Sequence, residues 1–273
     1  MNGKELAQAL TTGKHVYGTL IVSPSPFWPA TVASLGLDFV FIDTEHIPLD
    51  REKLSWMCQS YRALKLAPIV RIPSPDPFQA SMVLDGGATG VIAPYIESAD
   101  QVRALAGAVK HKPLKGRRLE DLLRQSTTIE PDLSDYLTQH NAGNVLIVNI
   151  ESVPAMEALE NILSVPELDA VLVGPHDLSC SLGIPEQYDH PRFQEAVDTI
   201  FRQARQRDKG AGIHMIFPRG FEQEIRWAQQ GANLILHSAD LIAVKETLTQ
   251  EFAHIKAALG DQPTSNDHES FNI

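Results

Sequence analysis

The stretch Leu146-Ile-Val-Asn-Ile-Glu-Ser152 has the pattern of a buried strand that ends in polar side chains. Because side chains alternate between the two faces of a strand, Ile147, Asn149 and Glu151 share one face. An amide and a carboxylate therefore project together from the end of an apolar run.

A second apolar run, Ala170–Val173, follows along the chain and ends in Gly174-Pro-His-Asp-Leu-Ser179. Its end also delivers a carboxylate, that of Asp177. Two buried strands that each end in a carboxylate indicate a metal site or an acid–base site.

Short apolar runs alternate with helical patterns along nearly the whole chain. The runs predicted as strands are Val16–Val22, Asp38–Asp43, Ala67–Ile72, Gly90–Ala93, Val145–Ile150, Ala170–Val173, Gly210–Ile216 and Asn233–His237. Helices are predicted over Phe27–Leu35, Arg51–Leu64, Pro77–Asp85, Ala99–Val109, Val153–Leu163, Pro191–Arg207, Phe221–Gln230 and Asp240–Ala258. Strands that are apolar on both faces and separated by helices favour a parallel sheet. The pattern predicts an α/β fold, a single (β/α)8 TIM barrel.

An open doubly wound sheet is the alternative architecture. A dinucleotide site in such a sheet needs a glycine-rich turn after the first strand. The chain has Ser23-Pro-Ser-Pro26 at this place, so neither that site nor an organic cofactor of that kind is expected.

Composition and charge favour some classes of protein function and argue against others. Of 273 residues, 43% are hydrophobic and 21% are charged, which is typical of a globular protein. The net charge of −11 argues against binding to nucleic acid or to an anionic membrane. The two cysteines, Cys58 and Cys180, lie far apart, as in a protein of a reducing compartment. With no signal-peptide pattern and no long apolar run, a cytoplasmic protein is expected.

Two regions depart from the strand–helix rhythm. Residues 110–143 form a long loop with its own charge pattern and one predicted short helix, Asp132–His140. Residues 260–273 are polar and are expected to be a disordered tail. The predicted domain is therefore one barrel over residues 1–259, with the long loop at about 110–143.

Ionisable side chains that could take part in catalysis or bind a ligand gather at the ends of the predicted strands. Active sites of such barrels lie at the C-terminal ends of the strands. The groups found there are Asp43, Glu45, His46, Arg71, Asn149, Glu151, His176, Asp177, His214, His237, Ser238 and Asp240. One carboxylate, such as Asp177, is equally well explained as a helix cap. Six of the eight strand ends share this feature, and the joint pattern indicates an active site.

Four motifs at these ends resemble a known enzyme family. Asp43-Thr-Glu-His46, Val70-Arg71, Asn149-Ile-Glu151 and Gly174-Pro-His-Asp-Leu-Ser179 are similar to motifs of the class II pyruvate aldolases, a family of the phosphoenolpyruvate/pyruvate barrel superfamily. The resemblance runs from about Gly18 to Leu248. It implies a divalent-metal-dependent aldolase that cleaves or forms 4-hydroxy-2-oxo acids, 2-keto-3-deoxy sugar acids included, through a pyruvate enolate with an aldehyde as the other half.

The resemblance also implies the roles of the metal-facing residues. Glu151 and Asp177 are the implied ligands of Mg²⁺, Mn²⁺ or a similar ion such as Co²⁺, which prefer oxygen ligands. Arg71 is expected beside the keto or enolate oxygen, and Asn149 beside the substrate. The backbone at Gly174, Pro175 and His176 is expected to hold the substrate carboxylate.

A histidine is the implied acid–base group. His46 would take the proton of the C4 hydroxyl, and Asp43 or Glu45 would orient it. Glu45 and His214 are also expected to face the substrate. In relatives an aspartate after the third helix reaches a neighbouring subunit's site, and the matching residue here is Asp85. The resemblance thus implies a homo-oligomer, a hexamer or trimer of dimers with an exchanged C-terminal helix.

The chain departs from the family pattern where the far end of the substrate is expected. Asn149 replaces a common glutamine, and His176, His214 and His237 stand where small or apolar residues are common. A basic segment from Lys110 to Arg118 lies in the long loop. Over the barrel mouth, Arg117 or Arg118 would recruit an anionic substrate tail; alternatively, the segment is a solvated loop that pairs with acidic helices.

Other functions fit the sequence less well. A Schiff-base aldolase needs a lysine at a strand's C-terminal end, and a phosphate-binding barrel needs glycines after strands seven and eight. The chain has neither. Two rivals stay open: a related metal-dependent acyl-CoA lyase or 2-oxo acid decarboxylase, and a barrel that binds a metabolite without turnover.

Overall fold

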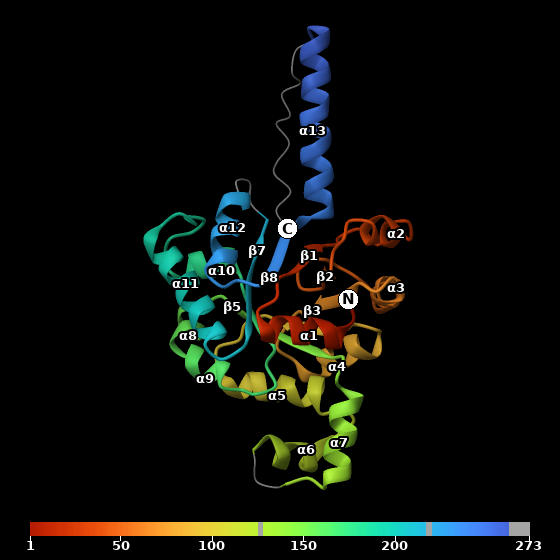
Figure 1. The fold of residues 1–273 in the computed structure, drawn as a ribbon, viewed down its shortest axis with the longest axis vertical. Coiled ribbons are helices and arrows are strands. Elements are labelled where there is room, and N and C mark those ends of the chain that lie inside the picture. Colours follow the sequence, from red (N-terminus) through yellow and green to blue (C-terminus); the bar gives the residue numbers. More distant parts are fainter. Residues whose placement is uncertain (125–127, 217–219, 262–273) are drawn as a thin grey trace.

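Eight parallel strands close into a barrel, each paired with the next in the sequence and the last with the first (Figure 1). The computed structural model of the chain describes residues 1–124, 128–216 and 220–261. The strands are β1 (Val16–Leu20), β2 (Phe39–Asp43), β3 (Ala67–Arg71), β4 (Gly90–Ala93), β5 (Val145–Ile150), β6 (Ala170–Val173), β7 (Gly210–Met215) and β8 (Leu234–Ala239). The barrel prediction is confirmed.

The helices alternate with the strands and form the outer layer. They are α1 (Gly3–Thr12), α2 (Trp28–Ala33), α3 (Arg51–Ala63), α4 (Pro77–Asp85), α5 (Ala99–Lys110), α6 (Gly116–Leu123), α7 (Pro131–His140), α8 (Val153–Glu157), α9 (Leu159–Leu163), α10 (Pro175–Ser181), α11 (Pro191–Arg205), α12 (Gly220–Gln229) and α13 (Asp240–Leu259). The single helix predicted over Val153–Leu163 is wrong in detail: the chain makes two short helices that meet at Ala158.

Local sequence signals explain where the helices begin. The side chains of Asp50, Asp76, Ser98 and Ser152 accept a backbone N–H of the first turn of α3, α4, α5 and α8. A proline stands in the first turn of α4, α8, α10 and α11, where no intrahelical N–H is needed. Helices α3, α4, α5, α8 and α10 therefore start directly after the loop that leaves a strand, whereas α11 follows α10.

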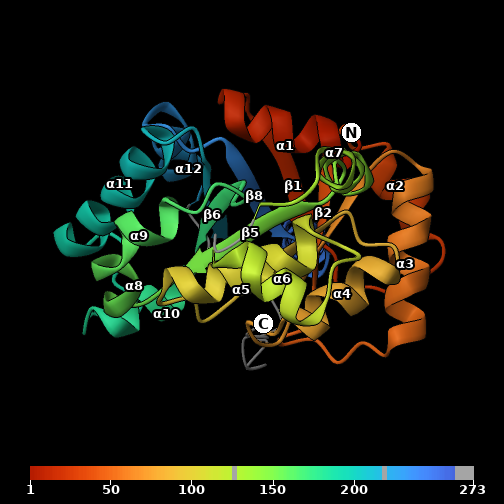
Figure 2. The ribbon, with the colours of Figure 1, turned by 90° about the horizontal axis from the view of Figure 1, so that it is seen from below.

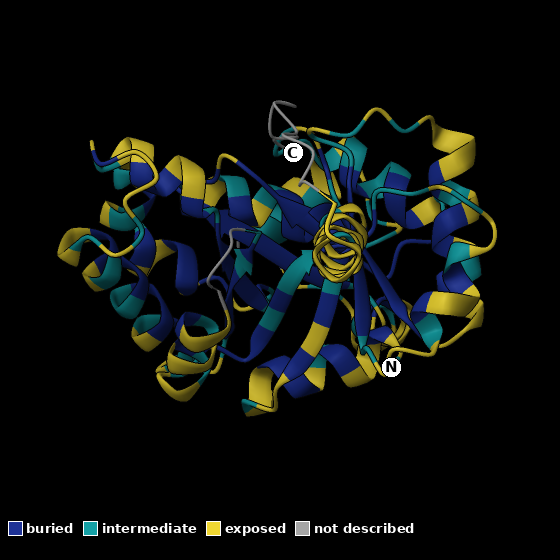
Figure 3. Cartoon of the chain, turned by 90° about the horizontal axis from the view of Figure 1, so that it is seen from above, coloured by how far each residue is buried: buried dark blue, intermediate teal, exposed yellow. Residues whose placement is uncertain are grey.

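Two apolar clusters follow the alternation of the strands. The inner cluster fills the barrel with side chains such as Phe41, Ile69 and Ile147, and Leu6 and Leu10 of α1 pack into it. The outer cluster lies between the strands and the helices. From above, most strand residues are dark blue, and most of the yellow, exposed residues lie on the outer helices and loops (Figure 3). The strand walls are therefore rigid supports for whatever their C-terminal ends carry.

The long segment between α5 and β5 lies at the amino end of the barrel. Helices α6 and α7 project below it, on the side opposite α13, and face the viewer from below (Figures 1 and 2). Lys110 pairs with Asp169, which precedes β6, and Lys112 pairs with Asp85, which precedes β4. The hypothesis that this basic segment covers the barrel mouth is therefore wrong, because its cations pair with carboxylates at the opposite end.

Helix α13 leaves the barrel instead of packing on it (Figure 1). Asp240 at its base is the buried residue of the helix, whereas Leu248 and Phe252 are exposed. Among the described residues, no helix combines the length and apolar content that a membrane crossing requires. The tail predicted over residues 260–273 lies outside the described residues from 262 on.

Candidate active site

The inward faces of the strands bring most of the predicted site residues into one space. Phe41, Ile69 and Ile147 belong to the inner cluster. Two positions further along the same strands stand Asp43, Arg71 and Asn149, which by the alternation of side chains face the same side. The mouth of the barrel therefore holds a carboxylate, a guanidinium and an amide from three strands.

Arg71 is held by two carboxylates at the end of β2. Its Nε and one terminal nitrogen donate to Asp43 Oδ1 at 2.8 Å and Oδ2 at 2.6 Å, as a bidentate pair. Nε also lies 3.1 Å from Oε2 of Glu45. The guanidinium lies 5.4 Å from the ring centroid of Phe41. Arg71 is thus fixed in direction before any ligand arrives.

The charges of this cluster stabilise each other. Burial alone would raise the pKa of Asp43, but the hydrogen bond and charge of Arg71 outweigh it, and the pKa is lowered. Burial likewise disfavours charged Arg71, yet Asp43 and Glu45 raise its pKa. Both groups are therefore charged at neutral pH.

His46 lies beside Glu45 at the rim. Its Nε2 is 3.7 Å from Glu45 Oε2, and its side chain is 48% exposed. Of the two carboxylates expected to orient it, Glu45 contacts the ring, while Asp43 is occupied by Arg71. The exposed ring is open to a ligand that enters the mouth.

Glu151 is the buried carboxylate of the opposite wall. Its Oε1 accepts the backbone N–H of Tyr95 at 2.7 Å, and its Oε2 accepts the Asn149 amide at 2.9 Å. Burial raises the pKa of Glu151, as do the nearby charges of Asp177 and Glu45, and these effects exceed the opposing hydrogen bonds. A cation near this carboxylate would relieve the repulsion.

Asp177 and Glu151 converge on Gly174, the residue that precedes α10. A β-carbon built on Gly174 would lie 2.7 Å from Oε2 of Glu151 and 3.6 Å from Oδ2 of Asp177. Each oxygen of Glu151 has one hydrogen bond and keeps a lone pair. Asp177 is exposed. Two hard, partly unsatisfied carboxylates fit Mg²⁺ or Mn²⁺, which retain several waters and use few protein ligands.

The described residues contain no group of three or more His, Cys, Asp or Glu side chains with metal-binding geometry. The candidate centre is therefore a pair of carboxylates rather than a closed protein cage. Its other coordination positions are left to water and substrate oxygens.

One polar atom of the site has no partner. Oδ1 of Asn149 is buried and accepts no hydrogen bond from the described residues, while its amide nitrogen is committed to Glu151. A buried acceptor without a donor is costly. Asn149 is therefore ready to accept a hydrogen bond from a ligand or water.

His214 lies on β7, close to the Arg71 cluster. Its ring packs edge-on against Phe41 at 5.4 Å, and Nε2 lies 3.2 Å from the carbonyl oxygen of Ser238. Burial lowers the pKa of His214 to about 4, and the Ser238 contact offsets this only in part. At neutral pH the ring is uncharged and donates from Nε2, which leaves Nδ1 as an acceptor.

Three other predicted residues lie away from this constellation. His176 on α10 contacts Glu186 at 3.7 Å and Cys180 at 3.9 Å. His237 lies on the outer face of β8, beside Glu224 at 2.8 Å. Asp85 ends α4 at the amino end of the barrel, so a single chain does not bring it to the mouth.

Tyr95, at the turn after β4, contacts the site but was not anticipated from the sequence. Its N–H binds Glu151, and the pKa of Tyr95 is raised to about 12 by a hydrogen bond to Glu45 and by the charges of Glu45, Glu151 and Asp177. Its backbone φ is 56°, a left-handed conformation that is uncommon for tyrosine and is not predicted by any sequence pattern.

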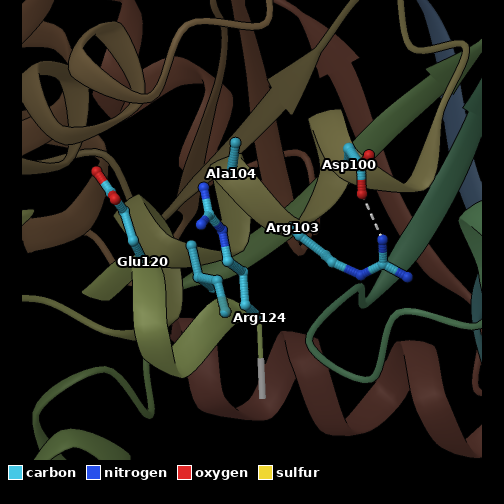
Figure 4. Close-up of a pocket in the computed structure, with 6 residues that line it drawn as sticks. Asp100, Arg103, Ala104, Glu120 and Arg124 are labelled. Atoms are coloured by element: carbon cyan, nitrogen blue, oxygen red, sulfur yellow. Dashed lines mark hydrogen bonds and ion pairs between the residues drawn. The ribbon is translucent and has the colours of Figure 1, made fainter. Parts of the chain in front are cut away.

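Hollows also lie outside the mouth among the described residues, and two of them are large. One, of about 570 Å³, lies between α5 and α6, where Arg103 pairs with Asp100 and Arg124 extends between Glu120 and Ala104 (Figure 4). The other is an apolar groove of about 530 Å³ on the outer face of β1 and β8; Tyr17, Ile225, Ile235 and His237 are among its lining residues. Neither contains the convergent carboxylates of the strand ends.

Comparisons with known proteins agree with the geometry. A family model described as HpcH/HpaI aldolase/citrate lyase matches residues 21–243. A 2-keto-3-deoxy-L-rhamnonate aldolase of Shigella sonnei is 29% identical over 250 residues, 92% of each chain. The crystal structure of an HpcH/HpaI aldolase from Desulfitobacterium hafniense has a TM-score of 0.78 at 26% identity, with 98% of this chain and 99% of that one covered. A citrate synthase, SbnG, has a TM-score of 0.79 at 28% identity, with 94% and 99% covered.

Proposed function

The chain belongs to the HpcH/HpaI aldolase/citrate lyase family and is an aldolase, and from this premise we propose how its barrel mouth cleaves a 4-hydroxy-2-oxo acid. The observation that carries the proposal is the convergence of Glu151 and Asp177 on Gly174, across the mouth from Arg71 and His46. One wall offers anionic oxygens, and the other offers a fixed cation and a histidine.

Glu151 and Asp177 are the proposed ligands of a divalent ion, Mg²⁺ or Mn²⁺ or a similar ion such as Co²⁺. Their oxygens and their mutual repulsion suit such an ion. When bound, it supplies a Lewis acid that stabilises negative charge on the substrate's keto oxygen. The side-chain N–H of Asn149 donates to Glu151, and Oδ1 of Asn149 is free to accept a hydrogen bond from a ligand or water.

Arg71 stabilises the enolate of pyruvate. Its direction is fixed by Asp43 and Glu45, so it adds positive charge beside the developing oxyanion without reorganisation. The backbone around Gly174, Pro175 and His176, at the start of α10, is the proposed seat of the substrate carboxylate.

His46 is the proposed acid–base group for the proton of the C4 hydroxyl. In cleavage it takes the proton of the C4 hydroxyl, the C3–C4 bond breaks, and C4 leaves as the aldehyde carbon. The electron pair of the broken bond forms the enolate, which becomes pyruvate when C3 is protonated. Glu45, whose Oε2 lies 3.7 Å from Nε2, orients the ring.

The aldehyde half faces the wall formed by β7 and β8. Neutral His214, with Nδ1 as an acceptor, stands there in place of an apolar wall. An acceptor suits the hydroxyl groups of a polyhydroxylated aldehyde. We therefore propose a 2-keto-3-deoxy sugar acid as the substrate class, the class that the name of the Shigella sonnei relative indicates.

The active form is a homo-oligomer. Helix α13 leaves the outer face of β1 and β8 without the helix that normally covers a barrel strand, and an apolar groove remains there. The exposed apolar residues of α13 recur every three or four positions: Leu241, Val244, Leu248, Phe252, Ile255 and Leu259. We propose that α13 of a second copy covers this groove and that Asp85 reaches a neighbouring site.

Pyruvate release tests the function. We expect the full chain to release pyruvate from 4-hydroxy-2-oxo acids with hydroxylated tails, to lose this activity in EDTA, and to regain it with Mg²⁺ or Mn²⁺. Pyruvate is measured with a coupled dehydrogenase, over a panel of substrates that vary in the aldehyde half.

The same assay separates the rival functions. Because SbnG is a citrate synthase, citrate formation is measured in parallel, and the panel includes acyl-CoA esters and oxaloacetate. Activity on those substrates alone would assign an acyl-CoA lyase or decarboxylase. Binding of a 2-oxo acid without any turnover, with or without metal, would contradict the aldolase mechanism.

A further inference from the structure

Tyr95 adopts a backbone conformation that side chains other than glycine rarely adopt. Its φ is 56°, and its side chain is 56% exposed. Lys65, Glu186, Asp208 and Ser238 also have a positive φ, and of these Lys65 and Asp208 stand just after a helix, where such residues are common. Tyr95 instead follows β4 at the barrel mouth, and a strained residue at such a place suggests a role in the site.

The left-handed turn directs the backbone of Tyr95 at the candidate metal centre. Its N–H donates to Oε1 of Glu151 at 2.7 Å. Its carbonyl accepts the side-chain amide of Gln101 at 3.1 Å, and Gln101 Oε1 accepts the N–H of Glu97 at 2.8 Å. The turn is therefore held from α5, and its N–H fixes one oxygen of the buried carboxylate.

The interaction with Glu45, the carboxylate that lies between Arg71 and His46, is the main reason why the pKa of the Tyr95 hydroxyl is raised. The ring of Tyr95 is therefore near the acid–base wall, while its backbone N–H binds Glu151.

We propose that Tyr95 is a positioning residue, whose left-handed backbone holds Glu151 in its metal-facing orientation. The inference rests on the proposed metal site. Tyr95 acts through this carboxylate.

Metal binding without turnover tests the backbone role. Mn²⁺ affinity of the full chain is measured by calorimetry for Tyr95→Gly and Tyr95→Val. Both variants remove the ring, but glycine adopts a positive φ freely and a β-branched residue does not. We expect Tyr95→Gly to bind Mn²⁺ as wild type does, and Tyr95→Val to bind about fivefold more weakly or worse.

Lys65→Val is the matched control. It places the same strain at a turn remote from Glu151, at φ 61°, and must leave Mn²⁺ affinity unchanged. Thermal unfolding shows that each variant is folded, which the exposure of the Tyr95 ring favours.

The outcomes distinguish the two proposals. If wild type does not bind Mn²⁺, or if Glu151→Gln binds it equally well, the proposed metal site fails. If Glu151→Gln binds weakly but Tyr95→Val matches Tyr95→Gly, the site stands and the positioning role of the backbone is overturned.

Tyr95→Phe separates the backbone from the hydroxyl. It keeps the backbone and the ring, so its Mn²⁺ affinity is expected to equal that of wild type. Weaker Mn²⁺ binding by Tyr95→Phe would assign the effect to the side chain and overturn the backbone role.

Discussion

The two walls of the site differ in how far their carboxylates are already satisfied. Asp43 accepts both arms of Arg71 and the N–H of Glu45, so it has little capacity left for a ligand. Glu151 has one hydrogen bond at each oxygen and a raised pKa. A cation therefore gains more from the Glu151 wall, and Asp43 serves to orient Arg71.

We expect the loss of His46 to affect proton transfer alone. We expect His46→Ala to slow aldol cleavage by roughly 10²–10⁴-fold, the usual contribution of a general acid–base group, with Mn²⁺ affinity unchanged. Single-turnover pyruvate release and calorimetry measure the two effects.

His140→Ala is the matched control, because His140 ends α7 at the amino end of the barrel and stacks on Tyr136. Its activity should equal that of wild type. Near-normal cleavage by His46→Ala would transfer the proton role to another group, with His214 as the first to examine.

The turn from β6 into α10 determines the space available at the proposed metal site. Gly174 has φ −84° and ψ 98°, which any residue can adopt, so its lack of a β-carbon matters for space and not for backbone freedom. The carboxylate of Glu151 occupies the position where a side chain would begin.

Gly174→Ala is therefore predicted to displace Glu151. The new β-carbon would lie 2.7 Å from Oε2 of Glu151, closer than real contacts allow, and 3.1 Å from its Cβ, which is a tight contact. We expect Mn²⁺ affinity to fall about tenfold or more, the effect of a loss of ~1.4 kcal/mol. Gly143→Ala, where a β-carbon meets nothing within 4 Å, should bind normally. Wild-type affinity of Gly174→Ala would place the ion away from Glu151.

The strands were predictable from the sequence, and the folding of the loops was not. Runs such as Val145–Ile150 and Ala170–Val173 are apolar on both faces, and the structure has the same bounds for them. The basic segment was misplaced because its partners, Asp169 and Asp85, are distant in sequence. Tyr95 was missed because a positive φ in tyrosine depends on contacts with Glu151 and Gln101, which only the fold creates.

In the whole molecule, a single chain leaves the outer face of β1 and β8 uncovered by a helix. Helix α13 projects from the barrel instead of covering it, and Figure 3 shows the helix end-on and exposed. The groove on β1 and β8 exposes Tyr17 and Ile225, at 49% and 51%. Apolar surfaces of this extent usually mark an interface.

The apolar stripe of α13 supplies the last prediction. Replacing Leu248 and Phe252 by Glu places two charges in the proposed interface, and burial of an unpaired charge is strongly unfavourable. The mass in solution should fall from a multiple of 30.1 kDa to that of one chain, by light scattering on a sizing column. Gln250→Glu with Ala257→Glu adds the same charge on the other face of α13 and should leave the mass unchanged.

Mn²⁺ binding should survive in the single chain, because Glu151 and Asp177 belong to one barrel. Pyruvate release should fall, because Asp85 lies at the end of the barrel remote from its own site. A single-chain variant with full activity would show that each barrel works alone, and a wild-type mass of 30.1 kDa would contradict the exchange of α13.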